Sequence, residues 1–277
     1  MFFASVAALL GLIIGSFLNV LIVRHGVKGV GGRSGCMSCG HTLSVLDLVP
    51  VFSWISLRGR CRYCGSKISI QYPLVEAVTA LLFGLVAYPA QGIVVTGPLG
   101  VAIILLSFAM VAIFVAIAVY DLRHTIIPDS WVYLFAAAAL IYGILTTPPD
   151  FPIVWTLVAG PLAALPFAAM WFFSEGRWMG FGDAKLALGI GWLLGIEYSW
   201  AAILLAFVLG AVVSVAILLP VKYLPKLGIT SLEGIVGRFT MKSEVAFGPF
   251  LVCGSLIIWL LLLYGIDPVA LYAAVLS

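Results

Sequence analysis

Charged residues are scarce in this chain. Only 9% of its 277 residues are Asp, Glu, Lys or Arg, whereas 64% are hydrophobic. A soluble domain carries roughly 25% charged residues, so this composition excludes an ordinary soluble globular protein and indicates an integral membrane protein. The formal net charge of +3 is too small to indicate a nucleic-acid partner, and the position of each charge along the chain is more informative.

The N-terminal apolar run lacks the features of a cleaved signal peptide. No basic residue precedes it, and no small-residue cleavage site follows it. The residue that does follow it is Arg24. We therefore expect a retained first membrane span whose N-terminus lies outside the cytoplasm.

Long apolar runs predict the fold class. A helix needs roughly 20 apolar residues to cross a bilayer, so we predict an all-α polytopic membrane protein with about eight transmembrane helices. The runs lie near residues 2–23, 74–90, 100–120, 126–145, 153–173, 184–196, 200–220 and 247–266. The sixth run is short and can borrow length from the residues before it. The expected domains are a first transmembrane helix at 1–23, a cytoplasmic loop at 24–73 and a transmembrane core at 74–277.

The basic residues test this topology. With alternating spans, all 14 Lys and Arg residues fall on one side of the membrane. They lie in the first, third, fifth and seventh loops: Arg24, Lys28, Arg33, Arg58, Arg60, Arg62 and Lys67, then Arg123, then Arg177 and Lys185, then Lys222, Lys226, Arg238 and Lys242. The positive-inside rule makes that side cytoplasmic, so both termini should face outward.

Cysteines gather in the first loop as two C-x-x-C pairs separated by 21 residues. The pairs are Cys36 with Cys39 and Cys61 with Cys64. This spacing is near that of four-cysteine zinc sites, which are structural because no coordination position stays open. Two disulfides are an alternative that a reducing cytoplasm disfavours, and a redox C-x-x-C is another. We interpret His41 as a polar loop residue and spare ligand candidate, and Cys253 as a packed apolar residue.

Acidic residues within or beside membrane spans are costly, and they are functional candidates by default. Asp121 ends the third run in "AVYDLRHTIIPDS", and Asp183 opens the sixth in "GFGDAKL". By the alternating topology both lie at the cytoplasmic membrane edge. Asp129 follows a proline and is most simply a helix-start residue, whereas Glu76, early in the second run, could face a polar cavity.

Two carboxyl groups at one depth suggest acid–base chemistry. Close carboxyl groups do not both ionise readily, so one keeps its proton while the other is charged. The charged group can take a proton from water, and the protonated group can donate one to a peptide carbonyl, as in an aspartic peptidase. The structural alternatives are that Asp183 is the N-cap of the sixth helix, and that Asp121 pairs with Arg123.

Small and basic residues surround Asp183. Gly180 and Gly182 would let the backbone bend and let an extended substrate approach the carboxyl group. Lys185 would support this loop by holding a partner, or would face the lipid headgroups. These residues complete the site that we expect around the two aspartates.

The sequence resembles the type IV prepilin peptidases over nearly its whole length. The resemblance is carried by "GSFLNVLIVR", by "LDLVPVFSW" between the cysteine pairs and "ISIQYPLVE" after them, and by "YDLRHTIIPD", "GFGDAKL" and "FGPFL". It implies that Asp121 and Asp183 are the catalytic pair of a G-x-G-D intramembrane aspartic peptidase. It also implies an inner-membrane enzyme that cuts type IV prepilins or type II secretion pseudopilins after the glycine that ends a short basic leader.

Many members of this family also methylate the new N-terminus with S-adenosylmethionine. No familiar methyl-donor motif occurs in this sequence, so residues for that activity stay open. A transporter using membrane-edge acids is the alternative function. A membrane-tethered zinc interaction module is a third hypothesis, but it leaves both aspartate motifs unexplained.

Overall fold

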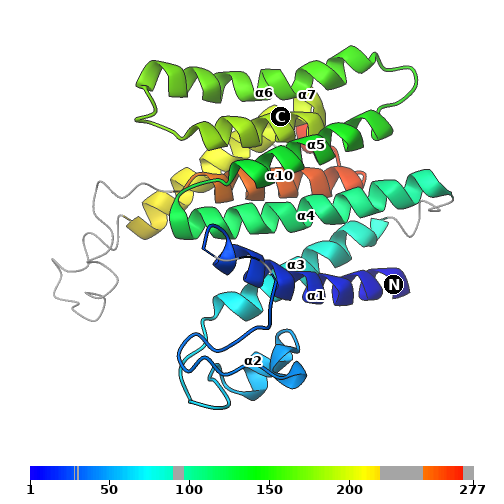
Figure 1. Cartoon of the computed structure of the whole chain (residues 1–277). Helices are drawn as coiled ribbons and strands as arrows, with labels where there is room; N and C mark the ends of the chain where they lie inside the picture. Colours follow the sequence, from blue (N-terminus) through cyan, green and yellow to red (C-terminus); the bar gives the residue numbers. More distant parts are fainter. Residues whose placement is uncertain (28, 30, 90–96, 219–245, 271–277) are drawn as a thin grey trace. The chain divides into compact units, whose positions relative to one another are not determined.

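The computed structural model describes residues 1–27, 29, 31–89, 97–218 and 246–270 (Figure 1). Within these residues every element of secondary structure is a helix, apart from the isolated β-bridges Gly35–Thr42 and Arg60–Lys67. The all-helical prediction is therefore confirmed. Lys28, Lys222, Lys226, Arg238 and Lys242, and the end of the run predicted at 200–220, lie outside the described residues.

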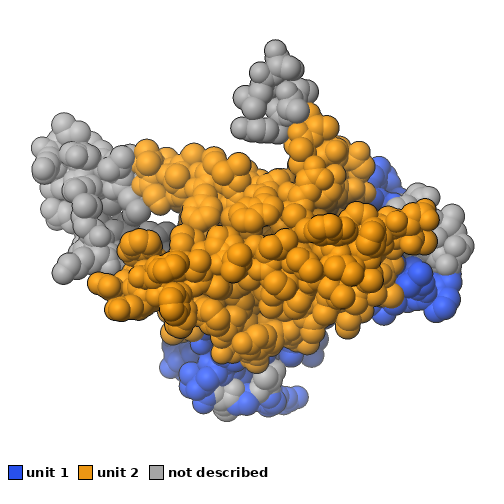
Figure 2. Space-filling view, turned by 90° about the horizontal axis from the view of Figure 1, so that it is seen from above, with its two compact units in different colours: residues 1–120 blue, residues 121–277 orange. Residues whose placement is uncertain are grey.

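The chain forms two compact units, Met1–Tyr120 and Asp121–Ser277, which Figure 2 distinguishes by colour. The helices of the first unit are α1 (Phe2–Arg24), η1 (Val45–Leu48), α2 (Phe52–Ser56), α3 (Gln71–Ala87) and most of α4 (Pro98–His124). The second unit holds the end of α4, then α5 (Asp129–Thr146), α6 (Ile153–Ser174), α7 (Phe181–Val213), the π-helical turn η3 (Ser214–Leu218) and α10 (Gly248–Leu263).

Among the described residues, five helical segments are long and apolar enough to cross a membrane: α1, α4, α5, α6 and Phe181–Ala216. Two shorter apolar helices, α3 and α10, accompany them. Length and composition therefore support a multi-pass membrane protein with five candidate spans. The sequence predicts about eight spans, and that number is not shown.

In the first unit, a buried polar side chain ties α1 to α3. Asn19 of α1 is only 1% exposed, and a buried amide needs hydrogen-bond partners. Its Nδ2 donates to the Tyr72 carbonyl at 3.1 Å, and its Oδ1 accepts from Gln71 Nε2 at 3.4 Å. Both partners lie in the first turn of α3, so this contact fixes the level at which α3 begins beside α1.

In the second unit, α7 is a hairpin of two helical halves. Its first half packs on α6, where Trp192 Nε1 donates to the Leu157 carbonyl at 2.9 Å. Its second half packs on α10, where the Phe207 and Phe247 rings are 4.7 Å apart. A straight helix would carry Phe207 about 36 Å from Asp183. Phe207 instead packs on Phe247, and the next residue, Gly248, lies beside Ile127, which the start of α7 also approaches. The second half therefore returns along the unit, as Figure 1 shows.

Gly195 makes this reversal. Its φ of 76° and ψ of 178° interrupt the helical backbone between the two halves. Residues with a Cβ are strongly disfavoured in this region of conformational space, which is almost exclusive to glycine. The apolar pattern predicts a boundary between the runs 184–196 and 200–220, and Gly195 lies just before it, one residue from the end of the first run.

Replacing Gly195 by alanine should therefore destabilise the second unit by about 1–3 kcal/mol, the usual cost of holding a residue with a Cβ in such a conformation. Thermal unfolding of the purified protein in detergent measures this loss. Gly210→Ala in the second half of α7 is the matched control, because a Cβ there meets nothing nearer than Phe250 at 3.5 Å. Equal melting temperatures for the two variants would contradict the role of Gly195.

Candidate active site and metal site

Asp121 and Asp183 come from segments far apart in the sequence and meet within the second unit. Asp121 lies in the last turn of α4 and Asp183 in the first turn of α7. Their residues are 4% and 8% exposed, and the two carboxyl groups lie close enough for a charge on Asp121 to act on Asp183. The structure thus brings together the two residues that the sequence singled out.

Neither structural alternative for these residues is found. The N-cap of α7 is Gly180, and Asp183 is three residues further on. Asp121 forms no ion pair with Arg123 among the described contacts. Its carboxylate instead accepts a hydrogen bond from the backbone N–H of Gly248, with Oδ2 and N 3.1 Å apart.

Gly248 is the site residue that sequence reasoning missed. It is the first residue of α10, and in the sequence "FGPFL" is notable only through the family resemblance. The local signal was present, since a Gly-Pro pair before an apolar run marks the start of a helix, where backbone N–H groups are free to bind an anion. The sequence gives no indication that this helix start meets Asp121.

One loop residue fills the space beside the carboxyl pair. Ile127 lies between α4 and α5 and is 8% exposed. A Cβ added to Gly182 would lie 3.0 Å from its Cβ, and one added to Gly248 would lie 3.2 Å from its Cδ1. Gly182 is thus required for close approach. The bend that we expected at Gly180 is an extended N-cap with φ of −72° and ψ of 147°, which any residue can adopt.

Lys185 does not point toward the carboxyl pair. Residues two apart on a helix face different directions, and the Lys185 Nζ lies 2.6 Å from Oδ1 of Asp129. The ammonium group also lies 5.3 Å from the Tyr133 ring and 5.2 Å from the Phe181 ring. Asp129 is the first residue of α5, as predicted, so this ion pair ties the start of α5 to the start of α7.

The four loop cysteines converge as predicted. Their Sγ atoms all lie within 4.8 Å of one another. The Sγ atoms of Cys36 and Cys64, one from each pair, are 3.8 Å apart, and a tetrahedron with metal–sulfur bonds of about 2.3 Å has edges of about 3.8 Å. All the cysteines are free thiols, which contradicts the disulfide alternative.

The two C-x-x-C turns are built alike. Cys36 N donates to the His41 carbonyl at 2.9 Å, and Cys61 N donates to the Ser66 carbonyl at 2.8 Å. The glycine after each pair, Gly40 or Gly65, has a φ of 71° or 70°. Glycine adopts this left-handed conformation without a steric penalty, so the repeated C-x-x-C-G sequence gives two matching turns that can hold one metal ion between them.

Hydrogen bonds lower the pKa of two of the four thiols, whereas burial and the neighbouring thiols of Cys36 and Cys64 raise the pKa of Cys39 to about 11. Hydrogen bonds from the backbone of Cys39 and Ser38 lower the pKa of Cys36 to about 6, and the thiolate is the form that binds metals. A hydrogen bond from Ser66 lowers the pKa of Cys64. His41 does not join the cluster of described ligands. Its ring stacks on that of Tyr63, with centroids 3.6 Å apart.

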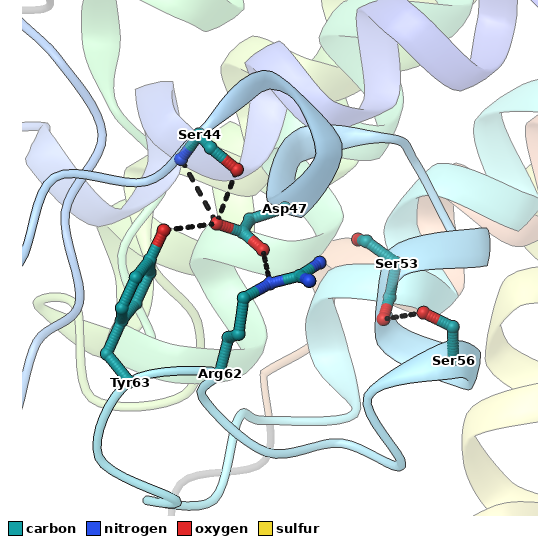
Figure 3. Close-up of polar contacts among 6 residues, drawn as sticks. All are labelled: Ser44, Asp47, Ser53, Ser56, Arg62 and Tyr63. Carbon is teal, nitrogen blue, oxygen red and sulfur yellow. Dashed lines mark hydrogen bonds and ion pairs between the residues drawn. The ribbon is translucent and has the colours of Figure 1, made fainter.

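Asp47 holds the second turn in place from the segment between the pairs (Figure 3). Its Oδ1 lies 2.7 Å from Nε of Arg62, and its Oδ2 accepts from Tyr63 Oη at 3.3 Å and from Ser44 Oγ at 2.8 Å. The side chain is 3% exposed. Burial raises the pKa of Asp47, but the contacts with Ser44 and Arg62 outweigh burial and hold it at about 2. The carboxylate is therefore charged at every physiological pH.

Glu76 connects the insert, the cysteine-containing loop at residues 24–73, to the membrane helices of the first unit. It is 7% exposed on α3, and its Oε2 accepts the Val51 backbone N–H at 2.7 Å. Val51 has a φ of 61°, a strained conformation for a β-branched residue. The sequence predicted that Glu76 could face a polar cavity, and the structure instead places its carboxylate against the backbone amide of Val51.

Two family descriptions match the sequence, each over its own part of the chain. Residues 9–90 match the bacterial Peptidase A24 N-terminal domain, and residues 108–215 match the type IV leader peptidase family. The second match covers Asp121 and Asp183. The first covers the four cysteines and Glu76.

Named relatives match over most of the chain. A protein from Burkholderia pseudomallei (strain 1026b) is 30% identical over 90% of this chain and 82% of its own length. One from Pectobacterium carotovorum subsp. carotovorum is 31% identical over 89% and 88%, and one from Bacillus subtilis (strain 168) is 28% identical over 97% of each. All three are named prepilin leader peptidase/N-methyltransferase. No solved structure matches the chain.

The Lys185–Asp129 ion pair should contribute a small coupling energy, because the Asp129 side chain is 65% exposed and exposed pairs give about 0.2–1 kcal/mol. Asp129→Asn, Lys185→Met and the double variant form a thermodynamic cycle, measured by thermal unfolding in detergent. The same cycle on Glu175 and Arg177, whose side chains are 82% and 75% exposed at 3.6 Å, should show no coupling. Equal values for the two pairs would refute a bracing role for Lys185.

Proposed function

Since the chain belongs to the type IV leader peptidase family, an aspartic peptidase family, we propose that it cleaves prepilins with Asp121 and Asp183 as the catalytic carboxyl groups. The observation that carries this proposal is the meeting of these two buried side chains at the ends of α4 and α7. Within the described ranges, no structural partner accounts for both of them. A transporter would not need two acids held together beside a third helix end.

The pair supports peptide hydrolysis without a covalent intermediate. One carboxylate takes a proton from water as the water oxygen attacks the peptide carbonyl carbon. The other carboxyl group donates its proton to the carbonyl oxygen, and a proton returned to the amine completes the cleavage. Two carboxyl groups that share one proton can fill both roles.

The substrates are type IV prepilins or type II secretion pseudopilins, whose short basic leader ends in glycine. A helical segment hides its carbonyls in hydrogen bonds, so the cut bond must be extended. Glycine favours that unwinding. The leader's positive charges would hold it on the cytoplasmic side, which fixes the depth of the bond relative to Asp121 and Asp183.

The enzyme is a multi-pass protein of a bacterial inner-membrane family. We propose eight passes, with α3, α10 and each half of α7 crossing the membrane, and both aspartates on the cytoplasmic side. The reversal at Gly195 supports two passes within α7. The domains proposed from the sequence, 1–23, 24–73 and 74–277, follow from this topology.

The four cysteines would hold a structural zinc ion. Four thiolates fill its coordination sphere and leave no position for a substrate, so the metal would stabilise the insert and take no part in hydrolysis. The relatives' names also include N-methyltransferase. We include methyl transfer from S-adenosylmethionine to the new N-terminus in the proposal, and we assign no residue of this chain to the methyl donor.

Asp121→Asn and Asp183→Asn should each abolish cleavage of a prepilin in membranes, because each variant removes half of the acid–base pair. Mass spectrometry of the products identifies the cut bond, which should follow the glycine. Asp129→Asn should retain most activity, since Asp129 faces Lys185. Near-normal turnover by either of the first two variants would refute the mechanism.

Purified protein should contain about one zinc ion per chain, as expected for a single four-cysteine site. Elemental analysis should show lower zinc in Cys36→Ser and Cys61→Ser, with a smaller loss of peptidase activity than in the aspartate variants. Cys253→Ser is the control. Cys253 is exposed on α10, and not packed as we expected, so its loss should leave the zinc content unchanged. Zinc-free protein prepared without chelator would exclude this site.

A further inference from the structure

The two carboxyl groups have unequal surroundings. Oδ2 of Asp121 accepts the Gly248 N–H at 3.1 Å in a buried setting. Among the described residues, no hydrogen bond to the Asp183 carboxylate is found. A directed N–H stabilises the charged form of a carboxyl group, so the backbone of α10 favours the anion at Asp121 alone.

The donor belongs to a helix start. Gly248 is the first residue of α10, and its N–H is one of the groups that have no partner within the helix. Pro249 follows and has no N–H. The positive end of the α10 dipole also favours a negative charge at this point. Hydrogen bond and dipole therefore act together on Asp121.

The other nearby charges do not cancel this difference. Asp183 lies in the first turn of α7, so that helix dipole favours charge on Asp183 as well, but without a directed donor. Lys185 binds Asp129 on another face of α7. Arg123 and His124, the basic residues at the end of α4, are both exposed. Within the part of the chain that the structure describes, the Gly248 N–H is the feature that distinguishes the two carboxyl groups.

The contact leaves no room for a side chain. A Cβ added to Gly248 would lie 2.6 Å from Oδ2 of Asp121, closer than Cβ atoms approach other atoms. The same Cβ would lie 3.2 Å from Cδ1 of Ile127. Any residue larger than glycine would therefore push the carboxylate away or move the start of α10.

We propose that Gly248 is a positioning residue that makes the carboxyl pair asymmetric. Asp121 is the charged member and takes the proton from water, while Asp183 carries the shared proton and gives it to the peptide carbonyl oxygen. As the resulting diol collapses, Asp121 returns its proton to the leaving amine and Asp183 takes one from a diol hydroxyl, which restores both groups. This assignment rests on the proposed peptidase function.

An epoxide distinguishes the two members without any substrate. A carboxylate opens the ring of 1,2-epoxy-3-(4-nitrophenoxy)propane by attack on carbon, and the ring oxygen takes a proton from an adjacent acid. The ester therefore forms on the charged member of a pair. Treatment of the full-length enzyme, followed by peptide mass spectrometry, should place the label on Asp121. Label on Asp183, or on neither residue, would overturn the assignment.

Gly248→Ala tests the cause of the asymmetry. Its label should shift from Asp121 toward Asp183, and its kcat should fall roughly 10- to 100-fold, as for loss of one hydrogen bond to a charged group, with a much smaller change in KM. Gly254→Ala on the same helix is the matched control. A Cβ there would lie 2.5 Å from the Ala202 carbonyl oxygen, so it should lower thermal stability and leave the label on Asp121.

The outcomes separate this inference from the proposed function. An enzyme that cleaves prepilin but carries the label on Asp183 refutes the assignment and keeps the peptidase. An enzyme labelled on Asp121 that cleaves no prepilin refutes the substrate class and keeps the asymmetric pair. If Gly248→Ala does not fold, the labelling of the unmodified enzyme still decides which carboxyl group is charged, and label on Asp183 still refutes the proposal.

Discussion

The hydrogen bond from Gly248 to Asp121 is the contact on which the arrangement of the site depends. A carboxylate among apolar helices has no water to solvate it, so its charge requires donors supplied by the protein. The start of a helix is one of the few places where backbone N–H groups are free. Asp121 uses the start of α10 in this way, and α10 must therefore begin beside the end of α4.

The need for close approach follows from that contact. Backbone and carboxylate meet because Gly248 has no side chain, and Ile127 packs against both Gly182 and Gly248. The loop after α4, the start of α7 and the start of α10 are thereby held around one point. The reversal at Gly195 returns the second half of α7 to this level of the unit, where Phe207 packs on Phe247.

In the first unit, too, buried polar side chains find their hydrogen-bond partners within the protein. Glu76 takes a backbone N–H from the strained Val51, and Asn19 binds the first turn of α3. In the insert, the Asp47 carboxylate accepts hydrogen bonds from Ser44, Arg62 and Tyr63. These contacts order a segment that has little apolar core, and they hold the two cysteine turns so that four thiols face one another.

The sequence by itself determined the helical class, the cysteine cluster and which two aspartates should lie together, because each rests on local pattern: apolar runs, C-x-x-C-G spacing and acids at the ends of spans. It could not determine what lies beside a residue distant in the chain. The local pattern predicts only a helix start at Gly248, a cavity-facing side chain at Glu76 and a bend at Gly180. Nothing local specifies the partners of these residues. Only the tertiary structure decided that Gly248 donates to Asp121 and Val51 to Glu76. Hydrogen bonds of this kind depend on how helices pack, and packing is a property of the whole chain.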